Sequence, residues 1–282
     1  MTMKMEMTHY NESWSHEYVK EVCQFLSDYA TAMLSAGATT SRIERCVARI
    51  SRKYMVEVDM SILPTRILLT VWDSEHSHNY SQVGKTHSNG INLNTTTQLS
   101  LLSHKIEDWI PSAECKDMEE GLLSNVKESA GELKKILDVP RINKHIVIFL
   151  TAVANLSFCR LFNGDYIAMS IVFANTAVGF YYKNLLLSWH INQHIVTIIA
   201  SIISALIGSS GFIFGISSTP NIALATSVLW LVPGIRFINA MSDILRGHYL
   251  VAHSRLTDAL ITTICLSVGL CLALIIFQIE WR

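Results

Sequence analysis

The sequence predicts a membrane protein in which an all-α bundle of five transmembrane helices follows a soluble α+β cytoplasmic domain. Three observations support this fold class. Residues 1–144 contain 16 of the 22 Lys and Arg and 19 of the 23 Asp and Glu. The rest of the chain contains five apolar segments, each close to the ~20 residues that cross a hydrocarbon layer. The first half instead shows the helix and strand periodicities of a water-soluble domain.

Two amphipathic helices are predicted at the start of the N-terminal domain, which we expect over residues 1–140. In the segment 15–36, apolar residues recur at three- and four-residue steps, and Gly37 suits the end of that helix. Ser41 and Glu44 have the spacing of a capping box, so a second helix is expected to begin there.

Strands and further helices complete this domain. Alternating and β-branched residues predict three strands, and longer apolar periodicities predict two helices, the first of them capped by Asn94. The expected strands are 55–60, 65–72 and 80–83, and the expected helices are 95–110 and 112–138.

The transmembrane domain is predicted over residues 141–282. Its apolar segments are about 145–162, 165–182, 194–214, 221–239 and 258–278. Lys and Arg flank these segments on one side, apart from Arg282, and the chain opens without a signal peptide. Both observations predict that the N-terminal domain lies in the cytoplasm and that the C-terminus lies outside.

Small residues at four-residue steps mark the third apolar segment. Ala200, Ser204 and Gly208 would let another helix approach closely. Either packing inside this chain or contact with another subunit would explain them.

The fourth apolar segment contains the strongest functional signal. Pro233 and Gly234 predict a helix break, and Arg236, Asn239 and Asp243 follow with the spacing of one helix face. Charged groups at membrane depth are costly, and a broken helix is tolerated where it faces protein or a water-filled cavity. The pattern therefore indicates a path for a solute.

Each residue of this stripe suits a role in substrate binding. The planar fork of Arg236 matches the two oxygens of a carboxylate. Asn239 would add hydrogen bonds, and Asp243 would bind a substrate ammonium or carry a coupling proton. Alternatively, Arg236 and Asp243 neutralise each other as a structural pair. Asn155 and Asn175 are amides at membrane depth that either line the path or join helices.

Other chemistry is disfavoured. A net charge of −1 argues against nucleic acid as a partner. We expect no enzyme activity, cofactor or metal, because no nucleophile–base arrangement is visible and the polar-loop histidines are more often solvated than metal-binding. The tripeptide Gly84-Lys85-Thr86 lacks the earlier glycine of a phosphate loop. The six cysteines lack C-x-x-C spacing and are interpreted as packing residues.

Two motifs resemble the threonine/serine exporter family. The first is Gly37-Ala-Thr-Thr40-Ser-Arg42-Ile-Glu44, and the second runs from Pro233 to Gly247 and is followed by Arg255 and a last apolar helix. The resemblance covers about residues 18–278. Position 236 is more often proline or apolar in this family, so that Arg236 is a departure and points to a subgroup with its own substrate.

The resemblance implies a cytoplasmic domain followed by membrane helices. It also implies export of threonine and serine by antiport, driven by the proton-motive force across the inner membrane. A second membrane part of four or five helices is implied as well, so we expect this chain to be the large subunit of a split transporter and to form an oligomer in the lipid bilayer. Split pairs of the family are associated with succinate export, so that amino acids and dicarboxylates are both candidate substrates.

Two further hypotheses stay open. A membrane-anchored hydrolase would use the N-terminal domain for its chemistry, although no nucleophile–base pair is visible there. A membrane-anchored sensor or scaffold would use that domain to bind a protein, although five helices with internal charges exceed what anchoring requires.

Overall fold

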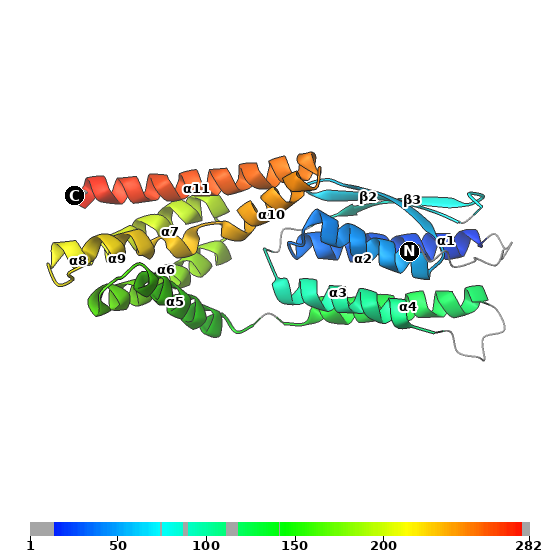
Figure 1. Cartoon of the computed structure of the whole chain (residues 1–282), viewed down its shortest axis with the longest axis horizontal. Helices are drawn as coiled ribbons and strands as arrows, with labels where there is room; N and C mark the ends of the chain where they lie inside the picture. The colour runs from blue at the N-terminus through cyan, green and yellow to red at the C-terminus, as the bar shows by residue number, and fades with distance from the viewer. Residues whose placement is uncertain (1–13, 74, 87–89, 111–117, 141, 278–282) are drawn as a thin grey trace, which may run out of the picture. The chain divides into compact units, whose positions relative to one another are not determined.

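The computed structural model describes residues 14–73, 75–86, 90–110, 118–140 and 142–277, and it is mostly helical with one small sheet (Figure 1). Its packing divides the chain into two compact units. The N-terminal unit combines Met1–Val139 with Asn239–His253, and the helical unit combines Pro140–Ile238 with Ser254–Arg282. The predicted division into a cytoplasmic domain, 1–140, and a transmembrane domain, 141–282, stays a prediction.

The N-terminal unit contains four helices and a three-stranded sheet among its described residues before position 140. The helices are α1 (His16–Ser35), α2 (Thr40–Lys53), α3 (Leu93–Asp108) and α4 (Met118–Asp138), and the strands are β1 (Glu57–Ile62), β2 (Arg66–Trp72) and β3 (Asn79–Lys85). The sheet is antiparallel with the order β1-β2-β3. The predicted strands and helices are therefore confirmed, with shifted ends; residues 112–117 of the last helix lie outside the described residues.

Two predicted helix caps are wrong. The capping box at Ser41 and Glu44 does not form, because α2 already begins at Thr40 and its N-cap residue, Thr39, makes no side-chain cap bond. Asn92, and not Asn94, caps α3 by accepting a hydrogen bond from the backbone N–H of Thr95. A cap residue needs extended backbone angles, which depend on how the preceding loop packs.

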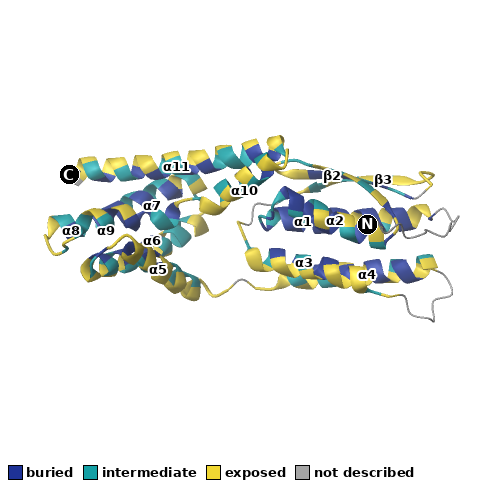
Figure 2. Ribbon diagram, in the orientation of Figure 1, coloured by how far each residue is buried: buried dark blue, intermediate teal, exposed yellow. Residues whose placement is uncertain are grey.

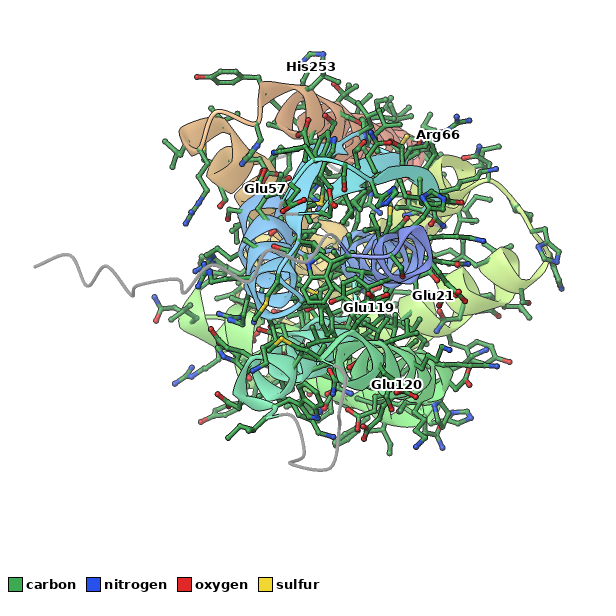
Figure 3. The ribbon with its side chains drawn as sticks, turned by 90° about the vertical axis from the view of Figure 1, so that its right-hand side faces the viewer. Glu21, Glu57, Arg66, Glu119, Glu120 and His253 are labelled. Carbon is green, nitrogen blue, oxygen red and sulfur yellow. The ribbon has the colours of Figure 1, made fainter. Side chains whose placement is uncertain are left out.

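One continuous hydrophobic core joins α1 to the sheet and to the other helices of the N-terminal unit. The buried residues of β2 alternate as Ile67, Leu69 and Val71, as expected for a strand with one covered face. Burial also raises the pKa of the Cys23 thiol to about 12, which supports the interpretation of this cysteine as a packing residue. Charged side chains such as those of Glu57, Arg66 and Glu120 lie on the outside of the unit (Figure 3).

The helical unit follows the predicted apolar segments closely. Its elements are α5 (Lys144–Leu161), α6 (Tyr166–Ser188), α7 (Gln193–Gly208), α8 (Ser210–Ile213), α9 (Pro220–Ser227), the 3-10 turn η1 (Leu229–Leu231), α10 (Gly234–Leu245) and α11 (Tyr249–Phe277). The last two helices contribute residues to both units. α11 begins nine residues before the predicted start at 258, because the helix continues through polar residues such as His253 and Arg255.

Three helices of the described chain are long and apolar enough to cross a membrane. They are α5, the pair α7 and α8 taken as Gln193–Ile213, and α11 over Tyr249–Ile276; a fourth crossing results if the bent pair Pro220–Leu231 and Gly234–Leu245 is one span. α6 has 23 residues but includes Asn175 and Lys183, and it is not among these helices. The prediction of five spans is therefore not confirmed in full.

Small and polar residues make up most of the buried positions of the helical unit, whereas many of its large apolar residues are exposed. The exposed residues are yellow in Figure 2. Ala200 and Ser204 are fully buried, and the hydroxyl of Ser201 donates to the Leu266 carbonyl of α11 at 2.7 Å. A side chain at Gly208 would meet Ser227 of α9. The small residues of α7 therefore serve packing inside this chain, as one of the two explanations predicted.

Candidate functional site

The predicted helix break lies between η1 and α10. Pro233 disfavours the helical conformation for the residue before it, and Val232 is extended with φ −63° and ψ 128°. α10 begins at the next residue, Gly234, and the two halves differ in direction by 61°. The break therefore separates an apolar half-helix from the polar stripe of α10.

Arg236 lies in the helical unit and pairs with a carboxylate that the sequence did not indicate. Its Nη1 donates to Asp258 Oδ2 of α11 at 2.6 Å and to Thr262 Oγ1 at 3.3 Å. Its Nε and Nη2 form no hydrogen bond with any residue that the structure describes. Side-chain exposures of 27% for Arg236 and 49% for Asp258 leave this pair accessible from outside the bundle.

Asn239 and Asp243 lie in the N-terminal unit, against the turn between α1 and α2. Asn239 Nδ2 donates to the Gly37 carbonyl at 2.9 Å, and the backbone N–H of Thr40 donates to Asp243 Oδ1 at 3.2 Å. Asp243 is fully buried and supplies an acceptor to the start of α2, where Thr39 provides no side-chain cap. A carboxylate at a helix N-terminus is favoured by the helix dipole.

The first family motif therefore meets residues 239–247 of the second in this unit. Besides those contacts, His248 Nε2 lies 3.2 Å from Glu44 Oε2. Gly37 and Gly247 both adopt positive φ, 85° and 83°, which glycine tolerates best, and they end α1 and α10. Of the other motif residues, Arg42 is half-buried on α2 and Arg255 is half-buried on α11.

Arg236 and Asp243 each bond to a different residue, and the alternative of a structural pair between them stays a hypothesis. Asp258 was missed because it lies 22 residues from Arg236 in the chain. The available signal was an isolated carboxylate at the start of the last apolar segment, followed four residues later by Thr262.

Asn155 and Asn175 bind the end of α9, beside the break. Asn155 Nδ2 donates to Thr176 Oγ1 at 2.7 Å and to the Thr226 carbonyl at 3.1 Å. Asn175 Nδ2 donates to the Ser227 carbonyl at 2.7 Å. The Oδ1 atoms of both amides are buried, and neither has a hydrogen-bond partner among the described residues. The two amides thus join α5 and α6 to carbonyls at the end of α9, and each keeps a buried Oδ1 without a partner among the described residues.

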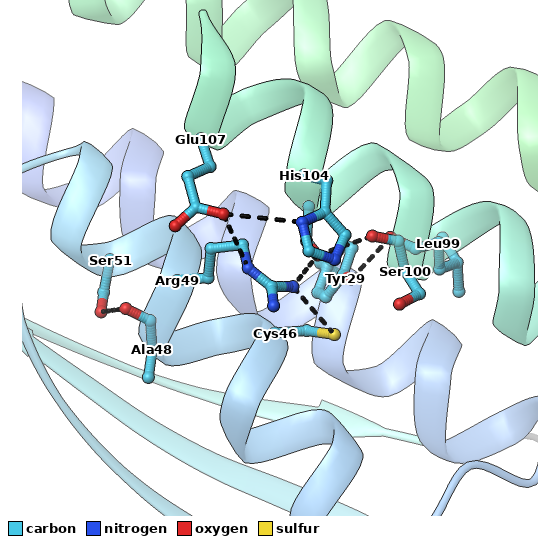
Figure 4. Close-up of polar contacts among 10 residues, drawn as sticks. Tyr29, Cys46, Ala48, Arg49, Ser51, Leu99, Ser100, His104 and Glu107 are labelled. Carbon is cyan, nitrogen blue, oxygen red and sulfur yellow. Dashed lines mark hydrogen bonds and ion pairs between the residues drawn. The ribbon is translucent and has the colours of Figure 1, made fainter.

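A separate polar network lies in the N-terminal unit between α2 and α3 (Figure 4). Arg49 Nε pairs with Glu107 Oε2 at 3.0 Å, and Arg49 Nη1 donates to Ser103 Oγ at 2.7 Å. His104 Nδ1 lies 3.6 Å from the same carboxylate. These contacts hold α2 and α3 together, so the network has a structural role that requires no ligand. The described residues contain no group of three or more His, Cys, Asp or Glu that could hold a metal ion.

Comparisons with known proteins agree with the two motifs. A family model described as "Putative threonine/serine exporter" matches residues 24–277. The "Probable succinate transporter subunit YjjP" of Escherichia coli (strain K12) is 26% identical over 256 residues, 88% of this chain and 91% of that protein. The protein of the same name from Klebsiella aerogenes is 29% identical over 255 residues, 87% of this chain and 90% of that protein. No solved structure is significantly similar.

Proposed function

Because this chain belongs to the threonine/serine exporter family, we propose that it is the large subunit of a two-component secondary transporter for small carboxylates. The chain is a multi-pass membrane protein of a transporter family, and its relatives are named as subunits of a succinate transporter. In the proposal, a second membrane subunit of four or five helices completes the path, and the proton-motive force drives export by antiport.

The membrane arrangement of the proposal follows the charge pattern. Five crossings of the inner membrane would leave the N-terminal domain in the cytoplasm and the C-terminus outside. α6 would then be the fifth crossing. It contains the polar residues Asn175 and Lys183, so we expect neighbouring helices to cover them. Such a helix is expected to face protein rather than lipid.

The observation that carries the proposal is the Arg236 guanidinium beside the break. It contacts Asp258 and Thr262 through one nitrogen, so that the Nε–Nη2 edge matches the two oxygens of a substrate carboxylate. Threonine, serine and succinate all contain such a group.

The other predicted site residues have roles in the same proposal. During the transport cycle, Asn239 and Asp243 release their hydrogen bonds with the Gly37–Thr40 turn. Asn239 then forms hydrogen bonds with the substrate, and Asp243 binds the substrate or a proton. Asn155 and Asn175 use their unpartnered Oδ1 atoms to accept hydrogen bonds from water or substrate along the path.

Transport by the full chain together with its companion membrane subunit tests the proposal. Both would be reconstituted in liposomes, and the flux of labelled succinate, threonine and serine would be measured under an imposed pH gradient. Arg236→Gln is expected to reduce flux about 10- to 100-fold, as for the loss of a charged hydrogen bond. Arg246→Gln is the matched control, because Arg246 is an exposed cation just beyond the end of α10.

Asp243→Asn tests the coupling. It keeps the size of the side chain and its acceptor for Thr40 but cannot exchange a proton, so flux should no longer respond to the pH gradient. Flux of none of the three solutes by the wild-type pair would overturn the transporter proposal. Unchanged export by both variants in cells would favour a sensor or scaffold instead.

A further inference from the structure

Two buried amides of the helical unit share one environment at the end of α9. Asn155 Nδ2 donates to the Thr226 carbonyl at 3.1 Å, and Asn175 Nδ2 donates to the carbonyl of the next residue, Ser227, at 2.7 Å. Asn155 Nδ2 also donates at 2.7 Å to the hydroxyl of Thr176, the neighbour of Asn175. These shared contacts place the two amide groups side by side, on α5 and α6, against the same end of α9.

The Oδ1 atoms of these amides are acceptors without a donor. Asn155 is 3% exposed and Asn175 is fully buried, and neither Oδ1 has a hydrogen-bond partner among the described residues. A buried polar atom without a partner loses its hydration and receives nothing in return. Two such atoms in one environment therefore indicate a ligand that supplies either donors or positive charge.

The neighbouring hydroxyl groups already donate elsewhere. Those of Thr176, Thr226 and Ser227 each donate to a carbonyl of their own helix, at distances between 2.6 and 2.8 Å. A buried water molecule would donate to the two Oδ1 atoms, but its own oxygen would find no free donor among these side chains, and buried waters typically form about three hydrogen bonds. A cation needs acceptors only, so it matches this environment better than water does.

The charge of the surroundings favours a monovalent cation. The described part of the helical unit contains two carboxylates, Asp165 and Asp258, which bond to Ser218 and Arg236 respectively. Divalent cations in proteins usually take carboxylate ligands. Uncharged oxygens beside the partial negative charge of a helix C-terminus suit an ion of one charge. In membrane transporters, the C-terminal ends of broken helices coordinate Na⁺ in this way.

We infer that the Oδ1 atoms of Asn155 and Asn175 bind Na⁺ at the end of α9. The inference goes beyond the proposed function, in which the proton is the coupling ion. Na⁺ is then a ligand of this chain itself, and its binding needs neither a substrate nor the companion subunit. Because the ion would hold α5, α6 and α9 together, it should stabilise the folded chain.

Thermal unfolding of the full chain in detergent tests the inference. NaCl would replace choline chloride stepwise at constant total chloride, so that the ionic strength does not change. A ligand at about ten times its Kd raises the Tm of a chain of this size by about 2–5 °C. We expect a rise of at least about 2 °C for the wild type.

Substitutions at the two amides assign the effect to this place. Asn155→Ala and Asn175→Ala each remove one Oδ1 and should reduce the Na⁺-dependent rise to less than about a third of the wild-type value. Ser201→Ala is the matched control, because it removes a buried polar group of the same unit that bonds to α11, and it should keep the full rise.

Aspartate variants separate loss of the ligand from poor folding. Asn155→Asp and Asn175→Asp keep an oxygen at each Oδ1 position and add negative charge, so they should keep or increase the rise. A folded aspartate variant that loses the rise would contradict the inference.

Two further outcomes would overturn the inference. Equal Tm values of the wild type in NaCl and in choline chloride would assign the two acceptors to water. A Na⁺-dependent rise that survives both alanine variants would place the ion elsewhere in the chain. Absence of carboxylate flux in the transport assay would instead overturn the proposed function and leave the Na⁺ result intact.

Discussion

The N-terminal unit and the helical unit bury opposite kinds of residue. In the first, large side chains such as Tyr18, Tyr29 and Leu26 are fully enclosed in one core. In the second, the buried positions are mainly small or polar, and the buried apolar residues form three separate small clusters. Leu161 and Ile275 of this unit are each 71% exposed. The N-terminal unit is therefore built on the hydrophobic effect, and the helical unit on close approach of helices and interhelical hydrogen bonds.

The same Leu→Ala change in each unit should give the largest contrast. Leu26→Ala removes a fully buried side chain of the N-terminal core and should cost about 2–5 kcal/mol. Leu272→Ala in α11 shortens a side chain that is 43% exposed, and should change stability by about 0.5 kcal/mol or less. Thermal unfolding of the full chain in detergent would measure both. Similar losses would show that the two units share one kind of core.

Enlarging a small residue should destabilise the helical unit more than the N-terminal unit, which is the reverse of the Leu→Ala result. A Cβ at Gly269 of α11 would lie 2.6 Å from the Ile198 carbonyl oxygen of α7, so Gly269→Ala must separate two helices. We expect a loss of about 1–3 kcal/mol, typical of overpacking. Gly131→Ala in α4 is the control: no atom lies within 4 Å of its Cβ, and alanine favours the helix by about 1 kcal/mol. A tolerated Gly269→Ala would contradict the close approach of α7 and α11.

A single interhelical hydrogen bond should have a smaller effect. Ser201→Ala removes the donor to the Leu266 carbonyl without adding volume. Such bonds between membrane helices contribute about 0.6 kcal/mol on average. Thermal unfolding of Ser201→Ala beside the wild type would measure this contribution. A loss as large as that of Leu26→Ala would mean that polar contacts dominate the helical unit.

The smallest effect on stability is expected from protonation of Asp73, in the turn between β2 and β3 of the N-terminal unit. Burial raises the pKa of this carboxyl, but hydrogen bonds from Ser77 and from the His78 backbone outweigh burial, so its pKa lies below the ordinary value. The stabilisation is therefore present above about pH 4, the unfolded pKa, and is lost as the pH falls through the folded pKa.

Acid unfolding would measure this contribution. Asp73→Asn should lose less stability than the wild type between about pH 6 and about pH 3, because the titrating group is gone. Identical acid sensitivity of the two proteins would contradict the lowered pKa. Ser77→Ala is a second check, because it removes one of the bonds that hold the ionised form.

Local patterns predicted most elements of both units. Charge distribution separated the polar first half from the apolar second half, and the periodicities located the helices and strands. The break at Pro233 was visible as well, because proline restricts its own and the preceding residue. Caps were less predictable: the choice of Asn92 over Asn94 depends on loop backbone angles that no short pattern encodes.

The sequence by itself determined the membrane character, the two motifs and the polar stripe of α10, because these depend on composition and on neighbours within a few helical turns. Only the tertiary structure decided the partners of that stripe. Asp243 reaches Thr40 across 203 residues of sequence, and Arg236 reaches Asp258 across 22. Such pairs depend on which helix faces pack together, and packing is set by the summed contacts of many side chains distant in the chain.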